Sequence, residues 1–148
     1  MDEKEFLMKV MEENWIHARQ SEDKRALIAN LILILTAIIQ ITITLTGFIL
    51  KAIPVTLLLI FIGGYGILTT MKLYERAQFH TLRARALRSR LNELFPNAQV
   101  QDLQINAERK HQEHYPIFYK TRLNNIWLCT YVFIIVLGIV ETMICIWM

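Results

Sequence analysis

Cysteine is scarce in this chain of 148 residues: there are two, Cys129 and Cys145, and both fall inside one apolar run. Neither has residues of a metal-ligand type nearby, so the pair indicates small packing residues rather than a disulfide framework or a zinc site. The sequence also lacks a glycine-rich phosphate loop, a nucleophile elbow, and a Ser/His/Asp group that could come together. These absences argue against an enzyme, and we expect neither a cofactor nor a metal ion.

Charge is missing from two long stretches, and these organise the chain. The apolar runs Ala26–Leu50 and Ile53–Leu73 contain no charged residue before Lys72. A third run, Ile126–Met148, is interrupted by one charge, Glu141. A helix needs about 20 apolar residues to cross a hydrocarbon core of roughly 30 Å, and each run is long enough. The sequence therefore predicts an all-α membrane protein with three transmembrane helices.

The remaining segments carry the charges, and their Lys and Arg residues predict the orientation. Segment 1–25 holds five Lys/Arg and seven Asp/Glu, and segment 74–125 holds nine Lys/Arg and five Asp/Glu. The turn between the first two runs offers only Lys51, and no basic residue follows the third run. Because Lys and Arg near span ends favour the cytoplasmic side, we expect the N-terminus in and the C-terminus out. The acidic start differs from a basic signal-peptide leader, so we expect the first span to be retained.

Four segments follow from this pattern. Residues 1–25 are expected to form a cytoplasmic amphipathic helix, and 26–73 a transmembrane hairpin with spans 26–50 and 53–73. Residues 74–125 are expected to form a cytoplasmic basic helical hairpin, and 126–148 the third transmembrane helix.

The cytoplasmic helices have their own signals. No Gly or Pro separates the N-terminal helix from the first span, so we expect one continuous helix. Pro96-Asn97 is expected to end the helix that continues from the second span. The N-terminal helix has an apolar stripe at helical spacing, which we expect to pack within the protein. Its members are Phe6, Leu7, Val10, Met11 and Trp15.

Polar residues inside the first span form a second pattern. Thr36, Gln40 and Thr44 are four residues apart and share one helix face. A glutamine near mid-membrane must find a hydrogen-bond partner or water. The face is therefore either a helix–helix contact held by hydroxyls and an amide or a polar strip that lines a pore.

The other two spans each carry one unusual feature. Glu141 lies about two turns from the C-terminus, and a carboxylate there either reaches the outer interface or a partner, or forms a ring at the outer mouth of an oligomeric pore. Such a ring would select cations. Gly63-Gly64-Tyr65-Gly66 invites comparison with a potassium-channel filter, but it lies inside an uninterrupted apolar run. We interpret these glycines as allowing close helix contact or a local kink.

The helix that follows the second span is strongly basic. Its arginines are expected to face a soluble partner protein or anionic lipid. They are Arg76, Arg83, Arg85, Arg88 and Arg90. Nucleic acid is not the expected partner, because aromatic residues are not interleaved with the basic ones as in base-stacking proteins.

A catalytic alternative rests on three residues of the central segment. His111 and His114 could share a helix face, and Arg109 stands five residues before His114, a spacing that loosely fits HEPN-type ribonucleases. Two histidines make a weak metal signal. A membrane-bound nuclease is therefore only the second alternative.

The stretch Glu13–Arg25 carries a family resemblance. An aromatic residue is followed by His-Ala-Arg, then by an acid and a base just before an apolar hairpin with a very short outer turn. This arrangement resembles the SLATT-type small bacterial membrane effectors, over roughly residues 10–95. The resemblance implies a pore-forming effector, associated with antiphage and nucleotide-signalling systems, that oligomerises in the inner membrane and permeabilises it when a partner senses infection. The family usually has two spans and a cytoplasmic tail, whereas this chain has a third apolar run.

The leading hypothesis is thus an oligomeric channel or pore-forming effector of the bacterial inner membrane, in an antiphage or toxin-like system. Its expected partners are further copies of the chain, the lipid bilayer and a soluble sensor or effector protein encoded nearby. The first alternative is a non-channel anchor that recruits a soluble partner. Oligomerisation is expected even without the family resemblance, since the three spans of one chain cannot enclose a water path.

Overall fold

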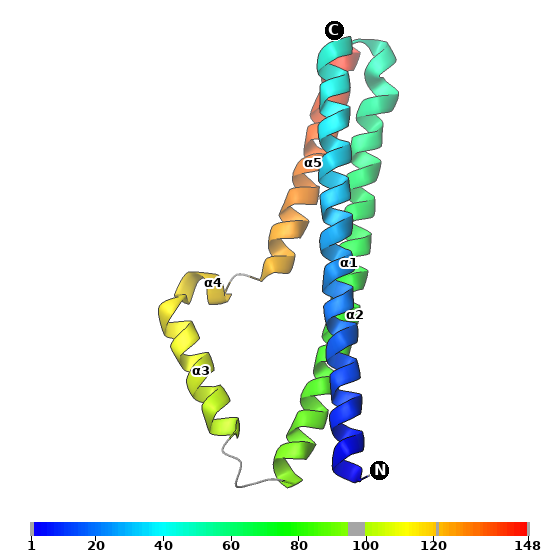
Figure 1. The fold of residues 1–148 in the computed structure, drawn as a ribbon. Helices are drawn as coiled ribbons and strands as arrows, with labels where there is room; N and C mark the ends of the chain where they lie inside the picture. Colours follow the sequence, from blue (N-terminus) through cyan, green and yellow to red (C-terminus); the bar gives the residue numbers. More distant parts are fainter. Residues whose placement is uncertain (1, 95–99, 121, 148) are drawn as a thin grey trace. The chain divides into compact units, whose positions relative to one another are not determined.

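The computed structural model describes residues 2–94, 100–120 and 122–147, and these residues form helices and short connections without any strand (Figure 1). Three helices are long: α1 (Glu3–Thr46), α2 (Ile53–Leu94) and α5 (Leu123–Trp147). Between α1 and α2 lies one 3₁₀ turn, η1 (Leu50–Ala52). Between α2 and α5 lie α3 (Val100–His114) and the short α4 (Pro116–Lys120). The predicted all-α fold is confirmed for the described residues.

The chain divides into two compact units. The first, which we call the arm unit, combines Met1–Glu22 with Glu75–Arg122. The second, the membrane unit, combines Asp23–Tyr74 with Leu123–Met148. Helices α1 and α2 each contribute one part to both units.

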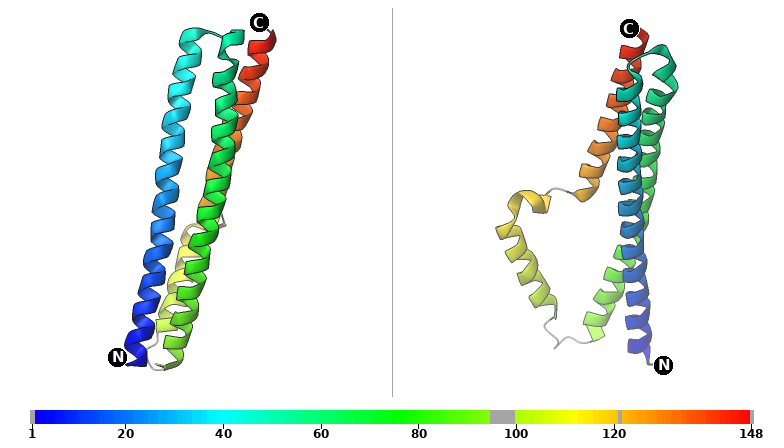
Figure 2. Two further views of the ribbon diagram at one scale, coloured as in Figure 1. Left: turned by 90° about the vertical axis from the view of Figure 1, so that its right-hand side faces the viewer. Right: turned by 45° about the horizontal axis from the view of Figure 1, so that its top comes forward.

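In the membrane unit, α1, α2 and α5 run side by side (Figure 2). The three helices are long and apolar enough to cross a membrane. They bury a narrow apolar core between them, made of Ala29, Ile32, Ile39, Ile43, Leu59, Tyr131 and Ile134. Large apolar side chains cover the outside of the unit, including Leu27, Ile41, Leu45, Phe61, Leu68 and Phe133. Since water would disfavour such a surface and hydrocarbon would not, the chain is a multi-pass membrane protein.

The helix ends differ from the predicted span boundaries. The first span was expected to reach Leu50, but α1 ends at Thr46, because Gly47 takes a left-handed conformation with φ of 78°. Residues with a Cβ rarely adopt this φ, so glycine marks the helix end. The third apolar helix begins at Leu123, three residues before the predicted boundary. In the sequence, these ends carry weaker signals than the apolar runs.

The arm unit contains the first part of α1, residues 3–22, and the last part of α2, residues 75–94. Their contact uses small residues, since Ala18, Ser21, Ala77 and Ala84 are buried together with Asn14. Small side chains let two helices approach closely. The expected continuity of the N-terminal helix with the first span is confirmed by α1.

The predicted apolar stripe of the N-terminal helix is confirmed only in part. Leu7, Val10, Met11 and Trp15 are half-buried, but Phe6 is exposed. The same helix face continues through Asn14, Ala18 and Ser21, which are buried. The predicted break at Pro96-Asn97 lies outside the described residues.

Candidate functional site

Glycines set the contact between α2 and α5 in the membrane unit. A Cβ built at Gly63 would lie 2.6 Å from Ile135 Cγ1, and one at Gly66 would lie 2.6 Å from the Tyr131 ring. One at Gly138 would lie 2.9 Å from Leu59 Cβ. These positions have no room for a larger residue, so the close helix contact predicted for Gly63 and Gly66 is confirmed.

Two hydrogen bonds join the same pair of helices at different depths. The Thr70 hydroxyl donates to the Tyr131 hydroxyl at 3.1 Å. The Thr56 and Thr142 hydroxyls lie 2.7 Å apart and share a hydrogen bond. Thr56, Thr70 and Tyr131 are fully buried. Such bonds hold the helices in one register, where the surrounding hydrocarbon offers no competing partner.

Buried positions follow a seven-residue repeat along these two helices, and sequence reasoning missed this signal. Thr56, Gly63 and Thr70 are seven residues apart on α2, and Tyr131, Gly138 and Cys145 are seven apart on α5. All six are buried. A seven-residue repeat of facing positions is the pattern of two helices that wind around each other.

Three polar atoms in the membrane unit are buried without a hydrogen-bond partner among the described residues. They are Thr36 Oγ1, Gln40 Nε2 and Glu141 Oε2. Glu141 is 5% exposed, so its carboxyl group points into the helix bundle of its own chain. Burying an unsatisfied polar group costs about 1–3 kcal/mol, and more for a charged one. These groups therefore call for water, an ion or a rearrangement that supplies partners.

Helix register places Gln40 and Glu141 at nearly one depth. The buried Arg25 donates to Asn124 Oδ1 at 3.5 Å, a pair 99 residues apart, and α1 and α5 run parallel within the membrane unit (Figure 1). The same offset puts Gln40 level with Ile139, two residues before Glu141, which is about 3 Å along a helix. The predicted candidates Gln40 and Glu141 thus share one layer of the bundle, and Thr36 lies one turn away.

Thr44 does not belong to this buried layer. It is exposed, and its hydroxyl donates to the carbonyl oxygen of Gln40 at 2.8 Å. Residues four apart rotate by about 40° around a helix at each step, so a strip that starts inside the bundle at Thr36 has turned outward by Thr44. Hydroxyl bonding to its own helix lets Thr44 face lipid without an unsatisfied donor.

In the arm unit, two histidines and an asparagine form a polar contact between α1 and α2. The rings of His17 and His80 lie 5.1 Å apart between centroids. His80 Nδ1 lies 3.1 Å from Asn14 Oδ1, and the Asn14 amide nitrogen donates to Val10 O at 2.8 Å. Partial burial, followed by the charges of His17, Arg76 and Arg83, lowers the pKa of His80 from 6.5. The contact therefore favours a neutral His80 that donates through Nδ1.

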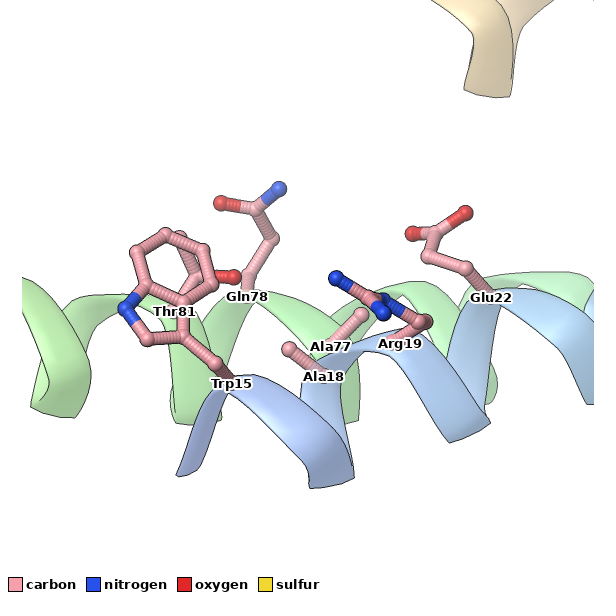
Figure 3. A pocket seen from close by; sticks show the side chains of 7 residues that line it. All are labelled: Trp15, Ala18, Arg19, Glu22, Ala77, Gln78 and Thr81. Atoms are coloured by element: carbon pink, nitrogen blue, oxygen red, sulfur yellow. The ribbon is translucent and has the colours of Figure 1, made fainter. Parts of the chain in front are cut away.

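Two cavities flank Trp15 in the arm unit. The first, about 320 Å³, has a floor of Ala18 and Ala77 between the Trp15 ring and the Arg19 side chain (Figure 3). Its remaining lining residues are Glu22, Gln78 and Thr81. The second, about 510 Å³, is lined by Trp15, Arg85, Arg88, Gln104 and Glu108.

The five predicted arginines do not form one surface. Arg85 and Arg88 border the second cavity, whereas Arg83 lies over the Phe79 ring at 5.4 Å and Arg90 pairs with Glu93 at 2.8 Å. Arg76 is exposed.

The residues of the nuclease alternative are exposed on α3. His114 Nδ1 lies 2.9 Å from the carbonyl oxygen of Lys110, and Arg109 donates to Asn106 at 3.4 Å. The His111 ring contacts Tyr115 and Tyr119. Across the described part of the chain, no three His, Cys, Asp or Glu side chains are grouped so as to hold a metal ion.

Comparison with known proteins gives no further constraint: no protein-family model, curated protein or solved structure matches this chain.

Proposed function

We propose that this protein is an oligomeric channel or pore-forming effector of the bacterial inner membrane, with its N-terminus in the cytoplasm and its C-terminus outside. The buried layer of the membrane unit is the observation that carries the proposal. Gln40 and Glu141 lie at nearly one depth, and with Thr36 they hold three buried polar atoms that lack partners among the described residues. A chain that only needed an anchor would gain stability by replacing them with leucine.

The single chain corresponds to a closed state in this proposal. Three helices packed around an apolar core leave no water path, and Glu141 is covered by its own bundle. A ring of Glu141 carboxylates around a pore axis therefore requires α5 to turn or to separate from the bundle on assembly. The hydrogen bonds between α2 and α5 oppose this movement, and hydration of Gln40 and Glu141 favours it in copies that have already assembled.

The orientation and the biological role have separate support. Lys and Arg flank the spans on the side of the arm unit, which the positive-inside rule assigns to the cytoplasm. The role in an antiphage or toxin-like system rests on the resemblance of Glu13–Arg25 to SLATT-type effectors. A soluble sensor would then act on the arm unit.

Ion flux through liposomes tests the role of the buried layer. Gln40→Leu and Glu141→Leu should each abolish flux while the oligomeric mass stays unchanged, because both remove a polar group from the conducting path. Thr44→Val is the matched control, since it also removes a polar group from α1 but at an exposed position outside the buried layer. If both leucine variants conduct like the wild type, the assignment of this layer to a pore is wrong.

A non-channel anchor is the alternative, and the second cavity favours it. Among the described residues, neither Arg85 nor Arg88 has an ion-pair partner within 4.0 Å, although both border this cavity with Trp15. A soluble partner with acidic side chains would fit there. A wild-type protein that passes no ions, yet loses a co-purifying partner on Arg85→Ala/Arg88→Ala, would support the anchor instead of the channel.

A further inference from the structure

The arm unit has two outward faces that leave apolar side chains uncovered. On α1, residues Glu5, Lys9, Glu12 and Ile16 form a stripe at spacings of four, three and four. On α2, residues Phe79, Arg83, Ala86 and Arg90 form a stripe with the same spacings. All eight are exposed, and Ile16 and Phe79 are 47% and 53% exposed. Both side chains lie outside the apolar runs of the sequence.

Each stripe points away from the contact inside the chain. That contact buries Asn14 and Ala18 on α1 and Ala77 and Ala84 on α2, which lie on the opposite sides of the two helices. The third helix, α3, approaches a different side of α2, where Arg85 and Arg88 border a cavity with Gln104 and Glu108. Both stripes therefore remain uncovered within the arm unit.

The two stretches carry equal and opposite charge. Residues 1–22 hold three Lys/Arg and six Asp/Glu, a net charge of −3. Residues 75–94 hold five Arg and two Glu, a net charge of +3. The stripes keep this difference in sign, since Glu5, Lys9 and Glu12 sum to −1 and Arg83 and Arg90 sum to +2, so an α1 stripe is electrostatically complementary to the α2 stripe of another copy.

The register inside one chain predicts how such copies would meet. The two stretches are antiparallel, so the numbers of residues at one height add to a constant. They add to 94 for the hydrogen-bonded pair Asn14 and His80, and to 95 for Ala18 and Ala77, which lie side by side (Figure 3). Copies related by rotation about an axis parallel to these two stretches keep every residue at the same height along that axis, so this constant would also apply between neighbouring copies.

At this register the two stripes match residue for residue. In a neighbouring copy, Ile16 would face Phe79, and the carboxylate of Glu12 would face the guanidinium of Arg83. One turn further along the two stripes, Lys9 would face Ala86. At the far end, Glu5 faces Arg90, whose present pairing with Glu93 is an exposed interaction of little worth that can be exchanged.

We propose that the α1 stripe Glu5–Ile16 docks on the α2 stripe Phe79–Arg90 of a second copy of this chain. The two surfaces are different, so the interface is heterologous, and a rotation about an axis parallel to the arm-unit helices would close it into a ring. The proposal deepens the proposed function and rests on it for one point, that all copies share one orientation in the membrane.

Charge reversal tests the facing pair Glu12 and Arg83. In detergent, Glu12→Arg and Arg83→Glu should each raise the concentration of half-assembly by roughly tenfold or more, because each places like charges opposite one another. The double variant restores the pair with reversed polarity and should assemble like the wild type. Glu113→Arg, the same change at an exposed site on α3, should have no effect. Unchanged assembly of both single variants, or a double variant that stays dissociated, would overturn the proposal.

Cysteine cross-linking tests the pair Ile16 and Phe79 without relying on charge. In a Cys129→Ala/Cys145→Ala background, a chain with both Ile16→Cys and Phe79→Cys should oxidise to a ladder of covalent multimers. Each single cysteine variant should form no covalent multimer, because a heterologous contact does not bring two copies of the same residue together. Dimers from a single variant, or an absence of the ladder in the double variant, would contradict the docking.

Measuring flux and cross-linking on the same preparation distinguishes a failure of the docking proposal from a failure of the channel proposal. If ions pass but the ladder is absent, this docking surface is wrong and the channel stands. If the ladder forms but wild-type protein passes no ions under any condition that assembles it, the docking stands and the channel is wrong.

Discussion

Substitution of Gly138 by alanine tests how tightly α5 packs on α2. A Cβ at this position would lie 2.9 Å from both Leu59 Cβ and Ile60 Cγ1, and 3.0 Å from the Thr56 carbonyl oxygen. Backbone cannot move aside without separating the helices, so overpacking should destabilise the membrane unit by about 1–3 kcal/mol. Gly64→Ala makes the same chemical change where the added Cβ meets no atom within 4 Å.

The two variants share the gain in helix propensity, about 0.8–1.0 kcal/mol for alanine over glycine. Their difference therefore isolates the packing term, and we expect Gly138→Ala to be the less stable by about 2 kcal/mol, or roughly 30-fold in the unfolding equilibrium. Titration with a denaturing detergent, followed by tryptophan fluorescence, measures the difference, because Trp127 lies half-buried on α5. Equal midpoints for the two variants would refute the close packing of Gly138 against α2.

Two further predictions concern single contacts. Because the pKa of His80 is lowered in the folded arm unit, its contribution to stability is complete above the unfolded value of 6.5 and is lost as the pH falls. Amide exchange of residues 10–20, corrected for intrinsic rate, should therefore be faster at about pH 5.5 than at about pH 7.5, and His80→Gln should reduce this difference; equal protection at both values would contradict it. Tyr131→Phe removes the acceptor of the buried Thr70 hydroxyl and should destabilise the membrane unit by about 0.6–1.7 kcal/mol. The Thr44 hydroxyl bonds only to its own helix among the described residues. Thr44→Val should therefore change stability by less than about 0.5 kcal/mol in the same titration.

Long-range apolar patterning made the helices predictable. The runs Ala26–Leu50, Ile53–Leu73 and Ile126–Met148 are long and nearly free of charge, and each lies almost entirely within one helix of the structure. The absence of Gly and Pro before the first run correctly predicted the continuity of α1. Helix ends were less predictable, because the stop at Thr46 depends on one glycine conformation inside a still apolar sequence.

The sequence identified some residues of the candidate site, but it could not show which side chains contact one another. Gln40 and Glu141 stood out because polar side chains are rare in apolar runs, and both have buried polar atoms without described partners. Thr44 was grouped with them by spacing, and in the single chain it is exposed and lies outside their buried layer. Thr56 and Thr142 were missed because a threonine in a span can bond to its own helix, and only the fold shows which threonines meet.

The histidine contact of the arm unit could not be inferred either. His17 and His80 are 63 residues apart in the sequence, and their ring contact depends on how α1 and α2 fold back on each other. The register of that contact has a consequence beyond the single chain. This register places Glu12 on the outward face of α1 and Arg83 on the outward face of α2 at the same level, as the proposed ring requires.

Ion flux through liposomes that contain the purified wild-type protein, with its oligomeric mass measured in the same detergent, tests the central claim most directly. The account predicts a discrete oligomer that passes ions. A monomer that passes none would contradict it, and the Arg85–Arg88 side of the arm unit would then be the place to search for a bound partner.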